Sequence, residues 1–372
     1  MEKNNKISSR IPYIDLGAGI MILWVLVFHA MKYANMLELK WLQHVGIDYI
    51  SQCRHVIMRE DGSLKSMFPI QYFPYLHFFM PWFFYKSGQF FRKRQLLDLI
   101  KKDADKLLWP FAIFSIIGFI FYLILQIFAG DVSVATCVVA PIHSLWKTGF
   151  VPINGPLWFL LTLVIVRTAA NVITLLPIGG RSALIIAATY ALSCAFYKWK
   201  LDFIPYWCVN STTGLMFFVL GYWLAQYETK WWLWIPCVAF YIANCIWGFS
   251  AVGMRTNVLL CGNYWLNMPC VLAGIVTFNV LCRLIAEYMP RFSSAFMFVG
   301  QYSMIIYVTH GLIYKTAFEL LKMYSPTSIM PYSFWIIIGA YLLFIPPICY
   351  IYYRLQKRRL RSNEPLNVTS KR

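Results

Sequence analysis

Charged side chains are scarce in this sequence. Only 13% of its 372 residues are Asp, Glu, Lys or Arg, whereas 60% are hydrophobic. A soluble domain usually contains roughly a quarter of charged residues, so its core could not hide this much apolar surface. The composition therefore excludes an ordinary soluble protein and predicts one that lies in lipid. The aromatic fraction of 18% agrees, because Trp and Tyr favour the membrane–water interface.

Motifs for metal binding, redox chemistry and phosphate binding are also missing. None of the ten cysteines forms a Cys-x-x-Cys pair or a Cys/His pair at metal-ligand spacing, and neither a Gly-rich phosphate loop nor a Ser/His/Asp order is visible. We therefore expect no metal site and no permanently bound cofactor. Most cysteines fall inside apolar runs and act as small hydrophobic residues. Cys53, Cys137 and Cys261 fall in segments expected outside, where one disulfide could form without further support.

Ten apolar runs approach the roughly 20 residues that a bilayer-spanning helix needs. We predict an all-α, polytopic integral membrane protein with about ten spans, at residues 11–31, 68–91, 107–129, 155–176, 182–198, 207–227, 231–249, 266–288, 296–321 and 334–353. The first run is too long for the apolar region of a cleaved signal peptide, so we expect it to remain. The spans form one domain, 1–361, and residues 362–372 are expected to be a disordered basic tail.

Lysine and arginine residues are unevenly distributed between the two sides. With the N-terminus inside, the inner segments hold 19 of them and the outer segments 11, while Lys86, Arg167 and Arg283 lie within runs. The positive-inside rule then predicts that both termini are cytoplasmic, in the cell (inner or plasma) membrane. Cytoplasmic loops and anionic lipid account for the net charge of +18, so we expect no nucleic-acid partner.

The longest predicted outer segment runs from residue 32 to residue 67. It mixes both signs of charge with an apolar pattern at 36–45 that is typical of a short interfacial helix. The segment is interpreted either as a cap over the helices or as a lid that binds an acceptor.

Three histidines fall at similar depth near the outward side of the predicted spans. His29 ends the first run, His77 lies in the outer half of the second, and His310 lies in the outer part of the ninth. Ionisable groups in a bilayer are costly and often functional, and histidine suits proton transfer near neutral pH. A single interfacial histidine is usually only solvated, but three at one depth favour a shared outer cavity.

Charged residues within the runs are the other candidates. Lys86 lies near the inner end of the second run, where it could either reach the headgroups or serve a site. Arg167 lies midway along the fourth run, where a buried partner or a cavity is expected. Asp15 lies near the cytoplasmic end of the first run and could pair with Arg10 or with a neighbouring helix.

Six short segments in the expected order resemble the membrane-bound acyltransferase family 3. They are YIDLGAGIMILWVLVFHA at 13–30, MPWFFYKSG at 80–88, KLLWPFAIF at 106–114, GPLWFLLTL at 155–163, FFVLGYWL at 217–224 and GQYSMIIYVTH at 300–310. Each segment alone is weakly specific, but six in register across nearly the whole chain identify a family.

The resemblance implies a ten-helix transferase that takes an acyl group, commonly acetyl, from cytoplasmic acyl-CoA to a hydroxyl or amine. Acceptors in the family are usually envelope sugars or small lipids. The family's essential first-helix histidine matches His29, but the cation expected eleven residues earlier is replaced by Ala18. We hypothesise that Lys86 restores this charge from the second helix. The histidine that often precedes Met-Pro is replaced by Phe79, and His77, two residues earlier, faces another direction on a helix.

These observations assign expected roles to the candidate residues. His29 acts as general base, and His310 and Tyr307, which share a helix face, orient it or the acceptor. Lys86 and Arg167 bind the phosphates of the acyl-CoA (acetyl-CoA) co-substrate or stabilise oxyanion charge. The remaining candidates for binding a sugar, glycan or lipid-linked acceptor are His77, Trp158 and Asp15. A transporter or flippase and an inactive scaffold in envelope-polysaccharide assembly remain as alternatives.

Overall fold

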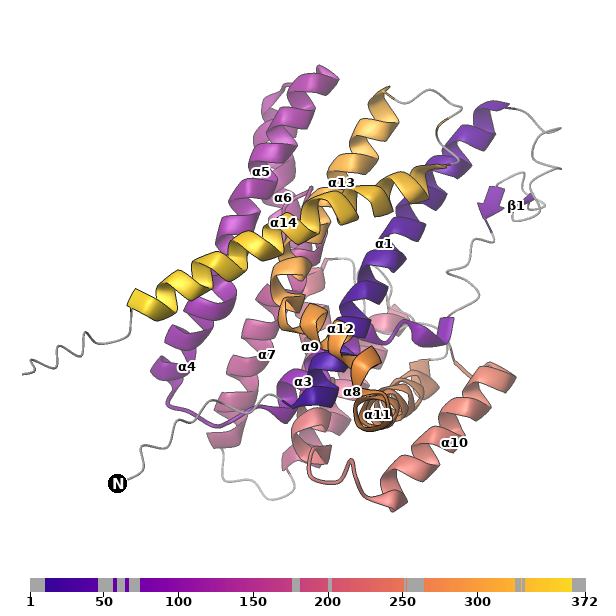
Figure 1. The fold of residues 1–372 in the computed structure, drawn as a ribbon, viewed down its shortest axis with the longest axis vertical. Helices are drawn as coiled ribbons and strands as arrows, with labels where there is room; N and C mark the ends of the chain where they lie inside the picture. The colour runs from indigo at the N-terminus through magenta and orange to yellow at the C-terminus, as the bar shows by residue number, and fades with distance from the viewer. Residues whose placement is uncertain are drawn as a thin grey trace, which may run out of the picture.

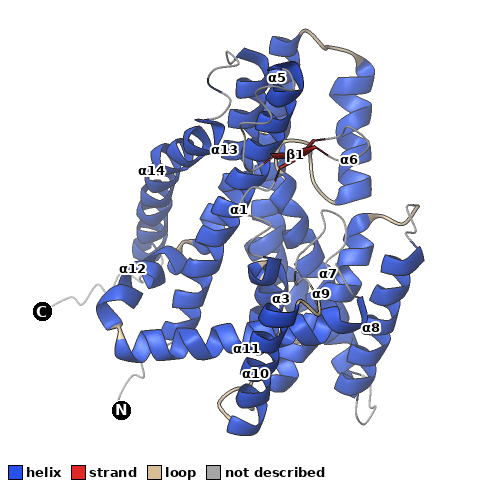
Figure 2. Ribbon diagram, turned by 90° about the vertical axis from the view of Figure 1, so that its right-hand side faces the viewer, coloured by secondary structure: helices blue, strands red, loops and turns tan. Residues whose placement is uncertain are grey.

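The computed structural model describes residues 11–45, 56–58, 64–66, 74–175, 181–199, 203–250, 252, 264–324, 329 and 332–362. Within these ranges the regular structure is helical, apart from one hairpin of two three-residue strands (Figures 1 and 2). The all-α prediction is therefore confirmed. Ser362, the first residue of the predicted tail at 362–372, is the last residue of a helix, whereas residues 363–372 lie outside the described residues, as do Cys53 and Cys261.

The first helix, α1 (Pro12–Val45), is longer than predicted. Its 34 residues correspond to about 51 Å, because no glycine or proline interrupts its second half. The separate interfacial helix predicted at 36–45 is therefore wrong, since that segment continues α1. Leu37 in this extension packs against Phe318 and Leu321 of a later helix, which explains why the apolar pattern persists there.

A short hairpin follows α1 in the outer segment. Strand β1 (Val56–Met58) pairs with β2 (Leu64–Ser66) in antiparallel register, with Met58 opposite Leu64, and β2 contacts α1. The sequence did not indicate this hairpin, and whether the segment is a cap or a lid stays a prediction.

The second predicted span is helical over only half its length. A 3₁₀ turn, η2 (Pro74–Leu76), precedes α3 (Phe79–Gln89), whose 11 residues reach about 16 Å, far less than the ~30 Å hydrocarbon layer. The prediction of one helix over 68–91 is therefore wrong for the part that the structure describes. Proline at positions 74 and 81 limits the helix, because proline fits a helix only in its first turn.

Helix α3 lies at the centre of the molecule against α9 (Tyr206–Leu224). Two glycines allow this close packing: a Cβ on Gly88 would lie 1.9 Å from the carbonyl oxygen of Phe218, and one on Gly221 would lie 2.0 Å from that of Tyr85. Small residues bring helix backbones together in this way in membranes. The largest fully buried side chains come mainly from these two helices: Phe79, Trp82, Phe84, Tyr85, Phe217 and Phe218.

The third predicted span begins earlier than expected. Helix α4 (Leu96–Asp103), the π-helical turn η3 (Ala104–Leu108) and α5 (Trp109–Ala129) form one continuous helix. A π-helical turn adds one residue to the turn and often marks a functional site. Here it immediately follows Asp103, a side chain that is buried despite its basic neighbours in sequence.

An unpredicted helical segment follows α5. The π turn η4 (Ala135–Val139) continues as α6 (Ala140–Thr148), which returns from the far end of α5 toward the middle of the molecule (Figure 2). Gly149 ends it with a positive φ of 81°, which glycine adopts readily. An irregular stretch then leads through the 3₁₀ turn η5 (Gly155–Leu157) into α7 (Trp158–Leu175).

The remaining helices agree with the predicted runs within a few residues or extend them. They are α8 (Arg181–Trp199), α10 (Trp231–Trp247), α11 (Tyr264–Tyr288) and α14 (Ser333–Ser362). Both views show α11 lying crosswise to α7 and α9 (Figures 1 and 2).

The ninth predicted span consists of two helices. Helices α12 (Pro290–Gln301) and α13 (Ser303–Tyr324) are bent by 67° at Tyr302. Helix α12 packs tightly against α1, since a Cβ on Gly19 would lie 1.9 Å from the carbonyl oxygen of Phe296. The bend lets α12 cross α1 low in the molecule while α13 runs upward beside it (Figure 1).

Five helices within the described ranges are long and apolar enough to cross a membrane, or six if the bent pair counts as one span. Two further apolar helices, at Ser182–Phe196 and Trp231–Trp247, are shorter. In the most apolar stretches of Leu96–Ala129 and Ser333–Lys357 only 11% is buried inside the protein, as expected for helices in contact with lipid. The protein is thus a helical membrane protein, whereas the count of ten spans and the cytoplasmic termini stay predictions.

Candidate functional site

A pocket with a cavity volume of about 120 Å³ lies between α1, α3, α13 and the irregular stretch before α7. We call it the histidine pocket. It is lined by Val25, Phe28, His29, Lys32, Tyr33, Phe79, Met80, Phe150, Pro152, Ile153, Gly155, Pro156, Trp158, Tyr307, Tyr314 and Lys315. Three of the predicted site residues, His29, Tyr307 and Trp158, therefore come together in one wall.

Two of the three predicted histidines meet at this pocket. The ring centroids of His29 and His310 lie 5.4 Å apart, and the ring of Tyr314 stacks on His29 at 4.7 Å with an interplanar angle of 7°. His310 is fully buried behind the pocket wall, whereas His29 reaches the pocket. The stack holds the imidazole of His29 in one plane.

Hydrogen bonding fixes the tautomer of neutral His310. Its Nδ1 lies 2.6 Å from the carbonyl oxygen of Tyr307, and a carbonyl can only accept, so this nitrogen carries the proton. The buried Nε2 of His310 is then an acceptor. Among the described residues this Nε2 has no hydrogen-bond partner, and neither has the buried Nδ1 of His29. Two unsatisfied ring nitrogens thus lie on adjacent imidazoles.

A glycine lets the stretch before α7 press against α13 beside His310. A Cβ on Gly311 would lie 2.2 Å from Oδ1 of Asn154 and 2.7 Å from Cδ of Pro156. At this contact the Nδ2 of buried Asn154 donates to the carbonyl oxygen of Val308 at 3.0 Å. The phenol of Tyr307 donates to the carbonyl oxygen of Pro156. The pocket wall is therefore held by the backbone of two segments far apart in sequence.

A second pocket, with a cavity volume of about 290 Å³, contains both predicted cations. We call it the cation pocket. It is lined by Phe83, Lys86, Ser87, Phe90, Phe159, Leu163, Arg167, Ser303, Met304 and Tyr307. Tyr307 lines both pockets, and its ring contacts that of Phe159 edge-on at 5.5 Å. Tyr307 therefore lies between the two pockets, and Phe159 packs against it on the side of the cation pocket.

Arg167 has a buried carboxylate partner. Its Nε lies 2.9 Å from Oδ2 and 3.1 Å from Oδ1 of Asp103, a residue only 2% exposed. Sequence reasoning expected a partner or a cavity and the structure has both, but it missed Asp103, because a single acid among lysines looks like part of a solvated loop.

The ammonium of Lys86 lies 5.2 Å above the ring of Trp82. Trp82 in turn packs against Gly17, since a Cβ there would lie 2.8 Å from its ring. Gly17 precedes Ala18, the buried residue at the position where the resemblance described above leads us to expect a cation. The ring of Trp82 therefore lies between Lys86 and the segment of α1 that contains Ala18.

The other two predicted site residues, His77 and Asp15, line neither pocket. His77 packs against Trp24 and Phe28, with ring centroids 6.1 and 5.0 Å away, on a neighbouring face of α1. Asp15 lies near the N-terminal end of α1, about 21 Å along the helix axis from His29. Neither residue lines the histidine pocket.

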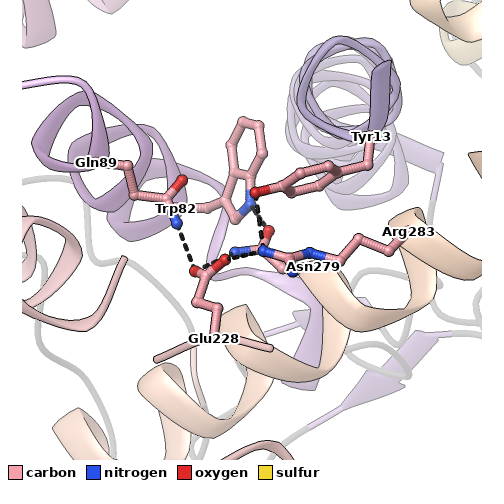
Figure 3. A network of polar contacts seen from close by, with 6 residues as sticks. All are labelled: Tyr13, Trp82, Gln89, Glu228, Asn279 and Arg283. Carbon is pink, nitrogen blue, oxygen red and sulfur yellow. Dashed lines mark hydrogen bonds and ion pairs between the residues drawn. The ribbon is translucent and has the colours of Figure 1, made fainter. Parts of the chain in front are cut away.

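A polar network that the sequence did not predict joins α1, α3, α11 and the turn after α9 near the N-terminal end of α1 (Figure 3). Glu228, just after α9, accepts hydrogen bonds from Gln89, Asn279 and Arg283, and Arg283 also donates to Tyr13 of α1. Asn279 accepts from Nε1 of Trp82 at 2.8 Å. The network therefore holds the ring beneath Lys86.

Burial raises the pKa of Glu228, while its hydrogen bonds and the charge of Arg283 oppose that effect. The side chain is 1% exposed, and Arg283 Nη2 lies 2.7 Å from Oε2. A carboxylate of this kind costs stability unless it is paired, so the arginine is integral to the network.

A known protein family matches nearly the whole chain. A family model described as an acyltransferase domain matches residues 11–354. No curated protein and no solved structure matches the chain. The matched region includes both pockets and the polar network, and it supports acyltransferase activity in general. This helical membrane protein belongs to acyltransferase family 3.

Proposed function

We propose that the protein transfers an acyl group, acetyl in the first instance, from cytoplasmic acyl-CoA to a hydroxyl of a cell-envelope sugar or glycolipid. His29 serves as general base in this reaction. One observation carries the proposal: the imidazole of His29 faces a pocket, with a second imidazole 5.4 Å behind it. Imidazole is the side chain best suited to moving a proton near neutral pH.

The two unsatisfied nitrogens suggest how His29 is oriented. Nε2 of His310 is an acceptor, so a small ring rotation or one bridging water lets Nδ1–H of His29 donate to it. That interaction leaves Nε2 of His29 without a proton and free to accept one from the acceptor. His310 is then a positioning residue, in the same sense as the third member of a hydrolytic triad.

The chemical step follows from this arrangement. The acceptor oxygen attacks the thioester carbonyl carbon while its proton passes to Nε2 of His29. The C–S bond breaks, and the proton passes on to the thiolate to give free CoA. An acyl-histidine route, in which His29 is the nucleophile, needs the same residue and leaves the same products.

The cation pocket is the proposed donor site. Lys86 and Arg167 line it, and CoA carries phosphates that ammonium and guanidinium groups bind. Under the predicted topology, with both termini cytoplasmic in the plasma (inner) membrane, this pocket lies on the inner side of Tyr307. The thioester then reaches His29 past Tyr307 and Phe159.

The test is transfer of label from radioactive acetyl-CoA to octyl glucoside by the purified protein. We expect activity in the unmodified protein and a loss of at least about 100-fold in His29→Ala. The matched control is His143→Ala, an exposed histidine on α6, which should retain full activity. Equal activity in His29→Ala and the control overturns the mechanism, and no label transfer or CoA release by the unmodified protein favours a transporter or scaffold.

The donor site has its own test. Lys86→Met should raise the KM for acetyl-CoA about 10-fold, because one charge–phosphate contact is lost, whereas Lys86→Arg should restore it. An unchanged KM in a folded Lys86→Met protein refutes the assignment of Lys86.

A further inference from the structure

A short basic stretch begins at the rim of the cation pocket. Phe90, which lines that pocket, directly follows α3 and is 50% exposed, and the irregular residues 91–95 come after it. We call residues 91–95 the basic stretch, because it presents three consecutive exposed cations: Arg92, Lys93 and Arg94. The proposed donor site uses Lys86 and Arg167 inside the pocket, so the proposed function gives these three cations no role.

The backbone of the basic stretch is fixed although its side chains are exposed. The backbone N–H of Arg94 donates to Oδ1 of Asn171, and Nδ2 of Asn171 donates to the carbonyl oxygen of Arg94, both at 3.0 Å. Asn171 is fully buried, and so its amide cannot turn toward water instead. Phe91 is buried against Phe218 of α9, with ring centroids 5.4 Å apart. The exposed cations are therefore attached to an ordered backbone.

Helix α7 connects the basic stretch to the cation pocket. Arg167, which lines the pocket, and Asn171, which holds Arg94, are four residues apart and so share a face of α7. Four residues correspond to about 6 Å along the helix axis. Helix α4, which carries the Asp103 partner of Arg167, packs beside α7 on the same side (Figure 1). The basic stretch thus lies about one helical turn beyond the pocket.

Positive charge gathers where the stretch, α4 and α7 meet. Lys102 of α4 lies within electrostatic reach of three cations and one acid: Arg94, Lys106, Arg167 and Asp103. The acid already pairs with Arg167 at 2.9 Å. Over residues 91–106 as a whole, six Lys or Arg face three Asp, so a positive surplus remains. An anion with more than one charge is attracted to such a place.

We propose that Arg94, Lys102 and Phe90 form a subsite for the nucleotide end of CoA, with the 3′-phosphate between the two cations and the adenine on the exposed phenyl ring. This inference rests on the proposed function and deepens it: the cation pocket takes the pyrophosphate, and the donor is a thioester that carries the phosphorylated nucleotide. A phosphate monoester carries close to two negative charges and is bound well by a guanidinium group. Nucleic-acid bases stack on aromatic side chains in the same way.

Binding to the purified full-length protein in neutral detergent tests the proposal without turnover. Calorimetry compares CoA with dephospho-CoA, which differs from it only by lacking the 3′-phosphate. We expect CoA to bind about 10-fold more tightly at low salt, because charge-assisted contacts are added, and the difference to shrink at high salt. Equal affinities for the two probes overturn the proposal.

Charge variants locate the effect. Arg94→Gln and Lys102→Gln should each abolish most of the preference for CoA, whereas Arg94→Lys should retain part of it. Lys101→Gln is the matched control, because Lys101 is an exposed neighbour on α4 whose loss changes the net charge equally. The same loss of preference in the control would reveal a general charge effect and overturn the subsite.

The adenine contact has its own variant. Phe90→Ala should weaken the binding of CoA and dephospho-CoA by the same factor, about 10-fold, because both carry the base. Phe90→Trp should bind both at least as well as the unmodified protein. Unchanged affinities in Phe90→Ala refute the stacking of the base.

The headgroup of an anionic lipid is the competing occupant, because such lipids attract lysine and arginine at a membrane surface. The calorimetry is therefore repeated in nanodiscs of phosphatidylcholine and in nanodiscs that also contain phosphatidylglycerol. We expect the preference for CoA over dephospho-CoA to persist in both. Its loss only where phosphatidylglycerol is present would assign the cations to lipid and overturn the proposal.

The two proposals fail separately. Acyl transfer from acetyl-CoA and from acetyl-dephospho-CoA with equal kcat/KM would refute the nucleotide subsite but leave the acyltransferase mechanism intact. An Arg94-dependent preference for CoA without any acyl transfer would refute the mechanism but leave the subsite.

Discussion

The phenol of Tyr307 donates its hydrogen bond to the carbonyl oxygen of Pro156, and this contact fixes the ring that lines both the histidine pocket and the cation pocket. Under the proposed mechanism, a side chain in this position would control whether water and thioester meet before an acceptor has bound.

Removing the Tyr307 ring should uncouple thioester cleavage from transfer. Tyr307→Ala joins the two pockets, so we expect acetyl-CoA hydrolysis without acceptor to rise about 10-fold, because water gains access to the thioester. Tyr307→Phe keeps the ring and should hydrolyse little more than the unmodified protein, although the lost hydrogen bond lowers stability by about 1–3 kcal/mol. Release of free thiol in the absence of acceptor measures the leak, and equal leaks in both variants would contradict this role.

The ion pair between Asp103 and Arg167 should support both folding and donor binding. Asp103→Asn leaves the guanidinium without its counter-charge, so we expect a loss of about 2 kcal/mol, below the ~3–5 kcal/mol of a fully buried pair because Arg167 is partly exposed. The KM for acetyl-CoA should rise as Arg167 changes orientation. Asp105→Asn, an exposed acid two residues along, serves as the control in thermal unfolding and kinetics. An effect of equal size in the control would exclude a specific pair.

Gly311 should tolerate no side chain. Gly311→Ala pushes a methyl group to within 2.2 Å of Asn154 and 2.7 Å of Pro156, so the stretch before α7 must shift, at about 1–3 kcal/mol. We expect a lower Tm and reduced transfer, because the shift displaces the pocket wall.

Gly339→Ala is the matched control for that substitution. Nothing lies within 4 Å of a Cβ at Gly339 in α14, so the change should be neutral or stabilising by up to about 1 kcal/mol. A Gly311→Ala protein that unfolds at the same temperature as the control would show that the contact yields easily.

The stability of the protein should depend on pH through Glu228. Its pKa is raised in the folded protein, so folding favours the protonated carboxyl. That contribution is complete below the unfolded pKa, near ~4.3, and is lost as the pH rises through the folded pKa. Glu228→Gln cannot titrate and should lack this component of the Tm–pH curve between acidic and neutral pH. The two curves would run parallel over that range if Glu228 did not contribute.

The sequence predicted the parts of the site that depend on position along a helix. His29 and His310 were expected at one depth because depth follows from counting residues along apolar runs, and their rings do meet. His77 was expected at the same depth, yet it packs on another face of α1. The direction in which His77 points depends on where α3 begins. The turn η2 and the prolines near it delay the start of α3 until after His77.

Partners formed by tertiary contact could not be predicted in this way. Asp103 lies in a basic stretch that is typical of a solvated loop, whereas in the structure it is buried and pairs with Arg167, 64 residues further along the chain. Asn154 belongs to an Asn-Gly-Pro sequence that is typical of a turn, and its role depends on Gly311, far along the chain. Similarly, α6 is too short and too mixed in polarity to be recognised as a span.

Because α1 is one uninterrupted helix, a tilt at one of its ends displaces residues far along it. Its N-terminal end is held at Tyr13 by a hydrogen bond from Arg283. The proposed base, His29, and Lys32 of the pocket lining lie on the same helix. A tilt of about 5° around Tyr13 moves His29, roughly 24 Å along the axis, by about 2 Å. Under the proposed mechanism, a displacement of that size decides whether His29 can take the proton, so a movement at the N-terminal end of α1 would be transmitted along the helix to the histidine pocket.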